Sequence, residues 1–407
     1  MKIHAGKPIG NILLTISFLL FVAIIAVAPI KQVLHVINEI PLGENTLKTY
    51  IKNTKGKLDE IYSNMLNFTS PPLVNKRTYI EINGSIARLM GQRRMNNVVK
   101  LKNEYLIAEW EGVDGIQPKL DTSPYVSGIK QLKEFCESRG IAFLFVQAPV
   151  KSCKYDKQLP MGISDFQNEN MDEFLSLVRG LGIEALDLRE LLHNDGLDHY
   201  QAFFKTDVHW TPETGFWAAN KIQSYFVNKG ILTNKNTVVQ NLSNYNIDVY
   251  TDIFVGNQAR KTGVAFGGIE NISLIYPQFD TNIHLSGNEI DKSGSFKDVM
   301  FDMSYMARDF EASPYNVYPL YPNQYIHFNN NAAENKKTIL FGSDSFGMVC
   351  APFLSLSVEN LFFGYATWSD LIRCLNTANP DIVVILFTSV NTWHLQQLAD
   401  VFKDQSE

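Results

Sequence analysis

Short apolar runs alternate with helical segments along most of this chain, from about residue 120 onward. Strands are expected at residues 141–146, 183–188, 338–341, 360–363 and 382–387, with helices around 129–135, 174–178 and 211–228 between them. Strands that are apolar throughout are typical of sheets covered on both faces. Strands that alternate with helices favour parallel pairing. The pattern therefore predicts an α/β fold, with a parallel sheet between two helix layers.

The rest of the chain divides by composition. Residues 1–30 read as a cytoplasmic N-terminus and a membrane anchor, and residues 31–119 as a juxtamembrane stalk and lead-in segment. Residues 120–407 form the predicted α/β domain. Within it, residues 231–335 are rich in Asn, Tyr and Gly and read as an irregular insertion of surface loops.

The N-terminal segment predicts a membrane anchor. Residues 8–30 contain no charged side chain, and about 20 apolar residues suffice for a helix to cross a bilayer. Lys2 and Lys7 precede the segment, which favours a cytoplasmic N-terminus and an exported remainder. A cleaved signal peptide is the alternative, with a cleavage site at residues 26–28. Pro29 would then begin the mature chain, and proline fits an extended protease site poorly, so we favour an uncleaved anchor.

Composition excludes several function classes. Lys and Arg number 36 against 42 Asp and Glu, a net charge of −6 without a dense basic tract, which argues against nucleic acid as a partner. No glycine-rich phosphate loop is present, so no nucleotide cofactor is expected. The eight histidines form no i, i+4 pair and predict no metal site. The four cysteines show no C-x-x-C spacing, and both disulfides and buried free thiols remain open.

An aspartate and a histidine two residues apart precede the helix expected at 211–228. Asp207 and His209 lie in a loop that leads to Thr211 as N-cap and Pro212 as first helical residue. A carboxylate at this spacing can hold an imidazole in one tautomer and stabilise its protonated form. The alternative is an ordinary helix-entry loop in which Asp207 makes turn hydrogen bonds.

A serine follows the strand expected at 338–341. Ser345 lies in the sequence Gly-Ser-Asp-Ser-Phe-Gly, before a helical stretch, and amides at such a turn can stabilise an oxyanion. Asn391 ends the last apolar strand and is a candidate second oxyanion donor. A capped turn and a polar strand end are the alternatives. Together, the residues supply a nucleophile, a base, its orienting carboxylate and an oxyanion donor, as acyl transfer or ester hydrolysis requires.

These motifs resemble those of known enzymes. The segments 342–346 and 380–391 resemble the first and third blocks of the SGNH (GDSL-type) hydrolase superfamily. Here the Asp-x-His-Trp-Thr motif precedes the serine, and this permuted order resembles the alginate O-acetyltransferase family (the AlgX/AlgJ type). The resemblance extends to residues 148–151 and 182–189 and covers about residues 120–400. It implies an SGNH-like α/β/α sandwich.

The resemblance also implies a function. It implies transfer of acetyl groups to hydroxyls of an exported or cell-envelope polysaccharide, outside the cytoplasmic membrane, through an acetyl-serine. Ser345 would be the nucleophile, His209 the general base and Asp207 its orienter. A multi-span membrane O-acyltransferase would supply the acetyl group. Family members often have an acidic–basic pair near the last strand, where this chain has Ser389-Val390-Asn391.

Contacts to the sugar have three candidates. Trp210 and Tyr365 could stack on sugar rings, and Lys151 could contact an anionic sugar; core aromatics and a solvated surface lysine are the alternatives. Two further functions remain open. An SGNH-type carbohydrate esterase would use the same residues with water as acceptor, and a non-catalytic scaffold of an envelope assembly would not use them at all.

Overall fold

The computed structural model describes residues 76–109, 115–233, 237–287, 290–307, 313–318, 325–365 and 374–389. Contacts divide the chain into a unit from Met1 to Val74 and a unit from Asn75 to Glu407. All described residues belong to the second unit.

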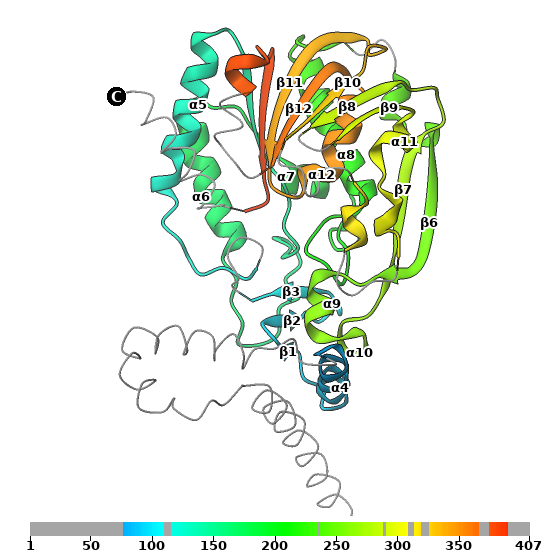
Figure 1. Ribbon diagram of the computed structural model, residues 1–407. Coiled ribbons are helices and arrows are strands. Elements are labelled where there is room, and N and C mark those ends of the chain that lie inside the picture. The colour runs from blue at the N-terminus through cyan, green and yellow to red at the C-terminus, as the bar shows by residue number, and fades with distance from the viewer. Residues whose placement is uncertain are drawn as a thin grey trace, which may run out of the picture. The chain divides into compact units, whose positions relative to one another are not determined.

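An eight-stranded sheet forms the centre of this unit, in the order β5-β4-β13-β11-β12-β10-β8-β9 (Figure 1). From β5 to β12 the strands run parallel, and the last three pair antiparallel with their neighbours. The predicted α/β core is confirmed, but the sheet is mixed rather than wholly parallel. The strands are β4 (Ala142–Gln147), β5 (Ala185–Asp187), β8 (Ile283–Gly287), β9 (Asp291–Gly294), β10 (Tyr325–Asn329), β11 (Asn335–Ser343), β12 (Val358–Tyr365) and β13 (Ile382–Phe387).

Helices cover both faces of the sheet (Figure 1). The helices of the described ranges are α4 (Lys76–Leu89), α5 (Val126–Ser138), α6 (Gln167–Gly180), α7 (Leu188–Asn194), α8 (Pro212–Asn228), α9 (Asn257–Thr262), α10 (Val264–Gly267), α11 (Phe296–Met300) and α12 (Gly347–Ser355). Successive strand side chains point to opposite faces. Leu144 of β4 accordingly packs in one apolar cluster with α8 and α12, whereas Phe145 packs in a second with α5 and α6.

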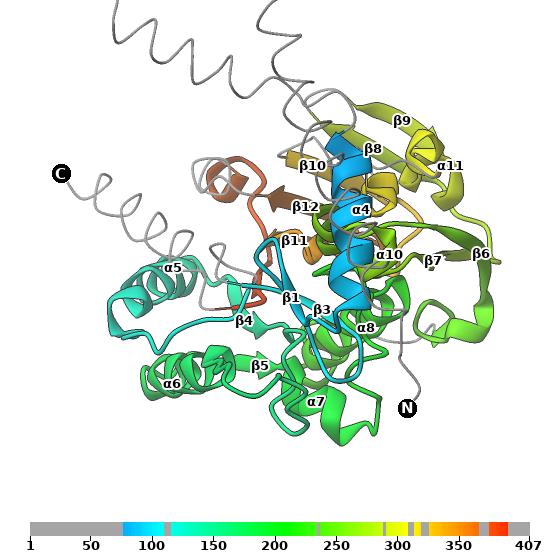
Figure 2. The same ribbon diagram turned by 90° about the horizontal axis from the view of Figure 1, so that it is seen from below.

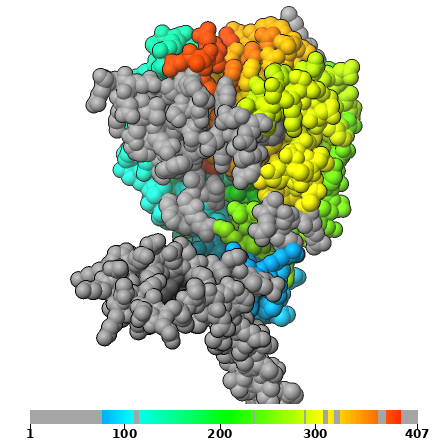
Figure 3. All heavy atoms as spheres, in the orientation of Figure 1, coloured from blue at the N-terminus to red at the C-terminus, as the bar shows by residue number. Residues whose placement is uncertain are grey.

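The segment from 231 to 335 is more regular than predicted. It forms a hairpin of β6 (Tyr245–Phe254) and β7 (Glu270–Pro277), and it adds β8, β9 and β10 to the central sheet. Its yellow and green atoms form the flank at the right of Figure 3. The prediction of irregular surface loops is therefore wrong for most of this segment.

A small sheet and α4 precede the central domain. The strands β1 (Arg94–Met95), β2 (Val98–Lys100) and β3 (Leu106–Ala108) pair antiparallel. Figure 2 shows α4 beside α10. α4 also packs closely on α9, because a Cβ on Gly84 would lie 2.2 Å from the carbonyl oxygen of Thr262. A larger residue at position 84 would therefore push these helices apart.

The predicted membrane anchor lies outside the described residues. Within the described ranges, no helix combines the length and apolarity that a bilayer crossing requires. The anchor at residues 8–30 therefore stays a prediction.

Candidate active site

Asp207, His209 and Ser345 form a continuous chain of short hydrogen bonds. His209 Nδ1 lies 2.6 Å from Asp207 Oδ1, and His209 Nε2 lies 2.7 Å from Ser345 Oγ. The Asp207 side chain is buried, whereas Ser345 and His209 are partly exposed. The structure thus brings together the three residues predicted as nucleophile, base and orienter, with the imidazole between the other two.

The loop before α8 holds Asp207 in its ionised form. The backbone amides of Asn257 and His209 donate to the Asp207 carboxylate, at 2.6 and 3.2 Å. Burial raises the pKa of Asp207, but the charge of His209, the hydrogen bond to the His209 side chain and these two amide bonds lower it well below its usual range. The helix then begins as predicted, with Thr211 as N-cap and Pro212 as the first helical residue.

Hydrogen bonds and close packing fix the turn that carries Ser345, called the serine turn below. Asp344 Oδ1 accepts from the Phe346 amide at 3.1 Å, and Asp344 Oδ2 accepts from the amide and hydroxyl of Thr388, just beyond β13. Gly347 must be small, because a Cβ there would lie 2.5 Å from the Ser343 side chain and 2.6 Å from Phe363. Ser345 therefore occupies a fixed turn at the carboxyl ends of β11 and β13, where open α/β sheets place their chemistry.

Tyr315 is a site residue that the sequence did not indicate. Its ring stacks on the His209 imidazole, with centroids 4.0 Å apart and planes at 15°. Its hydroxyl donates to the carbonyl oxygen of Ser345 at 3.5 Å. Tyr315 lies in a short segment without helix or strand periodicity, so no signal in the sequence could have placed it against the histidine.

Lys151 is buried behind the histidine loop rather than exposed to a substrate. Its Nζ donates to the carbonyl oxygens of Leu106, at 2.8 Å, and of Asp207, and only 5% of the residue is exposed. Burial lowers the pKa of Lys151 to about 8, against the charges of Asp207 and Glu270, which raise it. The prediction that Lys151 contacts an anionic sugar is wrong; Lys151 supports Asp207 instead.

Glu270 holds the same loop from another side. Its carboxylate accepts from the amides of Lys205, at 2.8 Å, and Thr206, at 2.6 Å, and from the Thr206 hydroxyl. Burial raises the pKa of Glu270, and its bonds to Thr206 oppose that shift. The buried Lys151 and the partly buried Glu270 thus fix the backbone immediately before His209.

The other predicted sugar contacts have different outcomes. Trp210 is fully buried, and its indole N–H donates to the carbonyl oxygen of Phe346 at 3.1 Å, so it cannot stack on a sugar. Instead, it ties the histidine loop to the serine turn. Tyr365 ends β12, and its side chain is not described. Asn391 lies outside the described residues, so its assignment as oxyanion donor stays a prediction.

The four cysteines are buried and form no disulfide with one another. Cys136 and Cys374 lie in the cluster beneath α5 and α6, and Cys350 lies in the cluster beneath α8. Burial raises the pKa of Cys136 to about 12. Thiols in such surroundings are inert and contribute as small apolar side chains.

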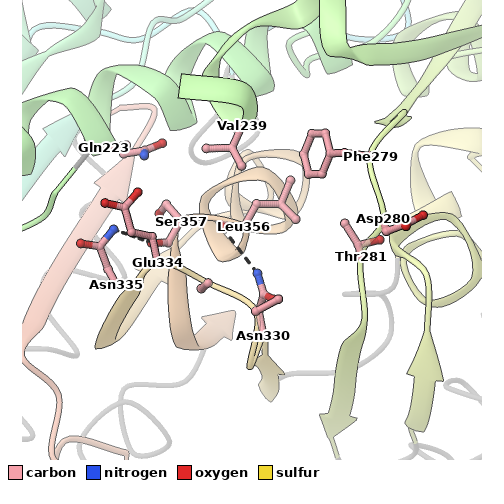
Figure 4. A pocket seen from close by; sticks show the side chains of 12 residues that line it. Gln223, Val239, Phe279, Asp280, Thr281, Asn330, Glu334, Asn335, Leu356 and Ser357 are labelled. Carbon is pink, nitrogen blue, oxygen red and sulfur yellow. Dashed lines mark hydrogen bonds between the residues drawn. The ribbon is translucent and has the colours of Figure 1, made fainter. Parts of the chain in front are cut away.

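A polar pocket at the other end of the sheet does not belong to this site. Asn335, which lines it, begins β11, whereas Ser343 ends that strand (Figure 4). The Asn335 side chain is occupied by the backbone of Thr233 and of Ser357. The pocket encloses only about 130 Å³. The Asn335 amide that lines it joins neighbouring segments of backbone.

Comparisons with solved structures show the fold. PatB1 of Bacillus cereus with a sulfonyl adduct has a TM-score of 0.58 at 16% identity, and the match covers 72% of this chain and 96% of PatB1. A DHHW family protein from Eubacterium siraeum has a TM-score of 0.51 at 16% identity, covering 76% of this chain and 96% of that one. The O-acetyltransferase domain of Pseudomonas putida AlgJ has a TM-score of 0.45 at 12% identity, covering 75% and 99%.

A comparison with family models shows what part of the chain is related to AlgX. No curated protein matches the chain. The family model described as SGNH hydrolase-like domain, acetyltransferase AlgX, matches residues 116–241, a range that includes Asp207 and His209. The predicted resemblance is thereby confirmed: this segment is similar to the AlgX acetyltransferase domain, and the fold is an SGNH-like α/β fold whose mixed sheet is flanked by helices.

Proposed function

We propose that this chain is an O-acetyltransferase that acetylates hydroxyls of an exported or cell-envelope polysaccharide through an acetyl-serine. The observation that carries the proposal is the hydrogen-bonded chain from Asp207 through His209 to Ser345. The description of the matching family model as an acetyltransferase supports acetyl as the group transferred.

In the first step, Ser345 Oγ attacks the carbonyl carbon of an acetyl donor, while His209 Nε2 takes the hydroxyl proton. Asp207 holds Nδ1–H and stabilises the imidazolium that forms. The tetrahedral intermediate collapses, the bond to the donor's leaving oxygen or sulfur breaks, and the imidazolium returns its proton to that atom. The acetyl group is then an ester on Ser345.

In the second step, a sugar hydroxyl attacks the acetyl-serine. His209 takes the proton of this hydroxyl, and after collapse it returns the proton to Ser345 Oγ. The sugar carries the acetyl ester, and the serine is free again. Water in place of the sugar would give acetate, so the acceptor that reaches this position decides between transfer and hydrolysis.

The oxyanion of both steps needs donors near Ser345. The amides of Phe346, Gly347 and Met348 are already bonded to Asp344 or Ser345 oxygens. The Ser345 amide donates to no residue in the described ranges, so we assign it as the first oxyanion donor. Asn391 is retained as the second, from its place after β13.

We further propose that residues 8–30 anchor the chain in the cytoplasmic membrane, with the catalytic domain on the extracytoplasmic face. Lys2 and Lys7 before the apolar run support this orientation. In that position the domain would receive acetyl groups from a multi-span membrane O-acyltransferase and meet the polymer after export.

The proposal is tested with the full-length chain and 4-nitrophenyl acetate as donor. Mass spectrometry of the quenched reaction should find one acetyl group on the peptide containing Ser345, and none in the Ser345→Ala variant. Addition of a glycan should then move the acetyl group to sugar. Acetate release without sugar ester would show an esterase, and normal glycan acetylation in cells carrying Ser345→Ala would show a scaffold.

A further inference from the structure

A cavity of about 400 Å³ opens beside the loop that carries His209. The end of α4, the strand β2, the segment after α9 and residues 205–206 form its walls. Its charged lining residues are Arg88, Arg93, Lys100, Glu104, Lys205 and Glu270. Four cations and two carboxylates thus face one cavity, in a chain whose net charge is −6.

The two carboxylates do not neutralise this cavity. Glu104 is shared by Arg93 and Lys100, at 3.3 and 3.4 Å. Glu270 is engaged by the three donors of Lys205 and Thr206 described above. The four cations therefore outnumber the two carboxylates and leave the cavity with an excess of positive charge.

Arg88 and Lys205 retain unpaired charge. Arg88 donates to the carbonyl oxygen of Ala265 at 3.0 Å, a neutral acceptor. The Lys205 ammonium lies 5.7 Å from the centre of the Tyr105 ring, and Lys205 is exposed. Among the described residues neither side chain forms an ion pair. Their charges are therefore available to an anion that enters the cavity.

The cavity borders the loop that carries the general base His209, which in turn lies 2.7 Å from Ser345 Oγ. Lys205 precedes His209 by four residues, so their α-carbons are at most about 14 Å apart. Thr206, which also lines the cavity, is next to Asp207. A polymer bound across this loop can contact the cavity with one unit while another unit lies at Ser345.

We propose that this cavity binds an anionic group, a carboxylate or a phosphate, on a unit of the acceptor polymer next to the unit that is acetylated. The inference rests on the proposed function, since it assigns the acceptor's charge. Arg and Lys bind such oxygens by charge-assisted hydrogen bonds. The pocket in Figure 4 offers a contrast, because the charged residues among its described lining are the acidic Asp280 and Glu334.

The test measures binding to the full-length chain by calorimetry at low ionic strength. The probes are a galacturonic acid hexamer, the neutral galactose hexamer and inorganic phosphate. We expect the charged hexamer to bind at least about tenfold more tightly than the neutral one, the effect of about one charge-assisted hydrogen bond. The double variant Arg88→Gln/Lys205→Gln should lose this preference.

A matched control separates the site from net charge. The control variant Lys130→Gln/Lys229→Gln also removes two positive charges, from an exposed lysine on α5 and an exposed lysine just after α8. It should bind the charged hexamer as tightly as the unmodified chain does. Equal binding of both hexamers, or an unchanged preference in the cavity variant, overturns the inference. Binding of phosphate alone, without the charged hexamer, also overturns it, since the cavity would then hold a free anion.

Failure of the proposed function would look different. Acetylation of Ser345 by 4-nitrophenyl acetate does not need a polymer, so it reports the nucleophile without the cavity. A chain that forms acetyl-Ser345 but shows no charge preference contradicts only the inference. A chain that prefers the charged hexamer but never forms acetyl-Ser345 contradicts only the proposed acetyltransferase function.

Discussion

Asp207 determines which nitrogen of His209 faces Ser345. The carboxylate accepts Nδ1–H, so Nε2 is free to take the serine proton. The amide of the Asp207→Asn variant can donate to Nδ1 and stabilise the other tautomer. We therefore expect the rate of Ser345 acetylation to fall by roughly 10⁴-fold, the loss seen when the aspartate of a Ser-His-Asp triad is made neutral. Stopped-flow release of 4-nitrophenol measures this rate.

The chain offers a matched control for this substitution. Asp291 and His284 form a second pair, 2.7 Å apart, on exposed β9 and β8. Asp291→Asn removes the same kind of contact away from Ser345 and should leave acetylation unchanged. A loss of less than tenfold in Asp207→Asn would contradict the orienting role.

Lys151 fixes the backbone of Asp207 from inside the fold. We expect Lys151→Met to slow acetylation of Ser345, because the Asp207 carbonyl loses the donor that fixes the loop leading to His209. The substitution also leaves the carbonyls of Leu106 and Asp207 without a donor, and the free energy of unfolding should fall by roughly 1–3 kcal/mol.

Lys154→Met is the control for Lys151. Lys154 pairs with Asp172 and Glu190 and contacts no triad residue in the described ranges. It should keep the unmodified rate of Ser345 acetylation. If that rate is also unchanged in Lys151→Met while stability falls, Lys151 serves the fold alone.

The site residues that the sequence predicts correctly are those whose partners are near in the chain or whose turn has a distinctive sequence. Asp207 and His209 lie two residues apart, and Ser345 follows an apolar strand into a helix. Trp210 and Lys151 are not sugar contacts, because distant segments bury their side chains; for Trp210 the alternative of a core aromatic holds. The acceptor of the Trp210 indole is 136 residues away, and that of Lys151 on β3 is 45.

At the scale of elements, the entry into α12 depends on Gly347. An added Cβ would overlap Ser343 of β11 and Phe363 of β12, so α12 would have to move away from the sheet. Overpacking of this kind costs about 1–3 kcal/mol. We expect Gly347→Ala to lower the free energy of unfolding by this amount, measured by urea denaturation, and to slow acetylation of Ser345.

Gly180 supplies the control. It ends α6, and a Cβ there would contact nothing within 4 Å. Gly180→Ala should leave stability unchanged or raise it by up to about 1 kcal/mol, because alanine loses less backbone entropy in a helix. Equal destabilisation by both substitutions would mean that space at position 347 is not the cause.

The elements predicted correctly are those with an apolar signal. β4 and β13 are runs of apolar residues covered on both faces, and α8 has its cap and first-turn proline. In the 231–335 segment this signal is weak: β6 alternates partly and fully exposed residues, and β9 is almost wholly exposed. These strands owe their place to backbone pairing with β7 and β8, which composition does not reveal.

At the scale of the whole molecule, the negative net charge conceals a local excess of positive charge. The net charge of −6 offers no general attraction to an anionic polymer. The cavity beside the histidine loop concentrates four cations within one small volume. Its attraction acts over about a Debye length, near 10 Å at 0.1 M salt. Recognition of the acceptor would thus be local and strongly dependent on ionic strength.

We also predict where the full-length chain resides in the cell. If residues 8–30 span the membrane uncleaved, the full-length chain should sediment with membranes and resist extraction by high salt and alkali, since about 20 buried apolar residues hold it there. Intact mass should include Met1 or its direct neighbour. A C-terminal tag should be removed by protease added outside spheroplasts, while a cytoplasmic control protein survives. A mature chain that begins at Pro29 and is released from the membrane would show a cleaved signal peptide instead, and a tag protected from the protease would reverse the orientation that Lys2 and Lys7 predict.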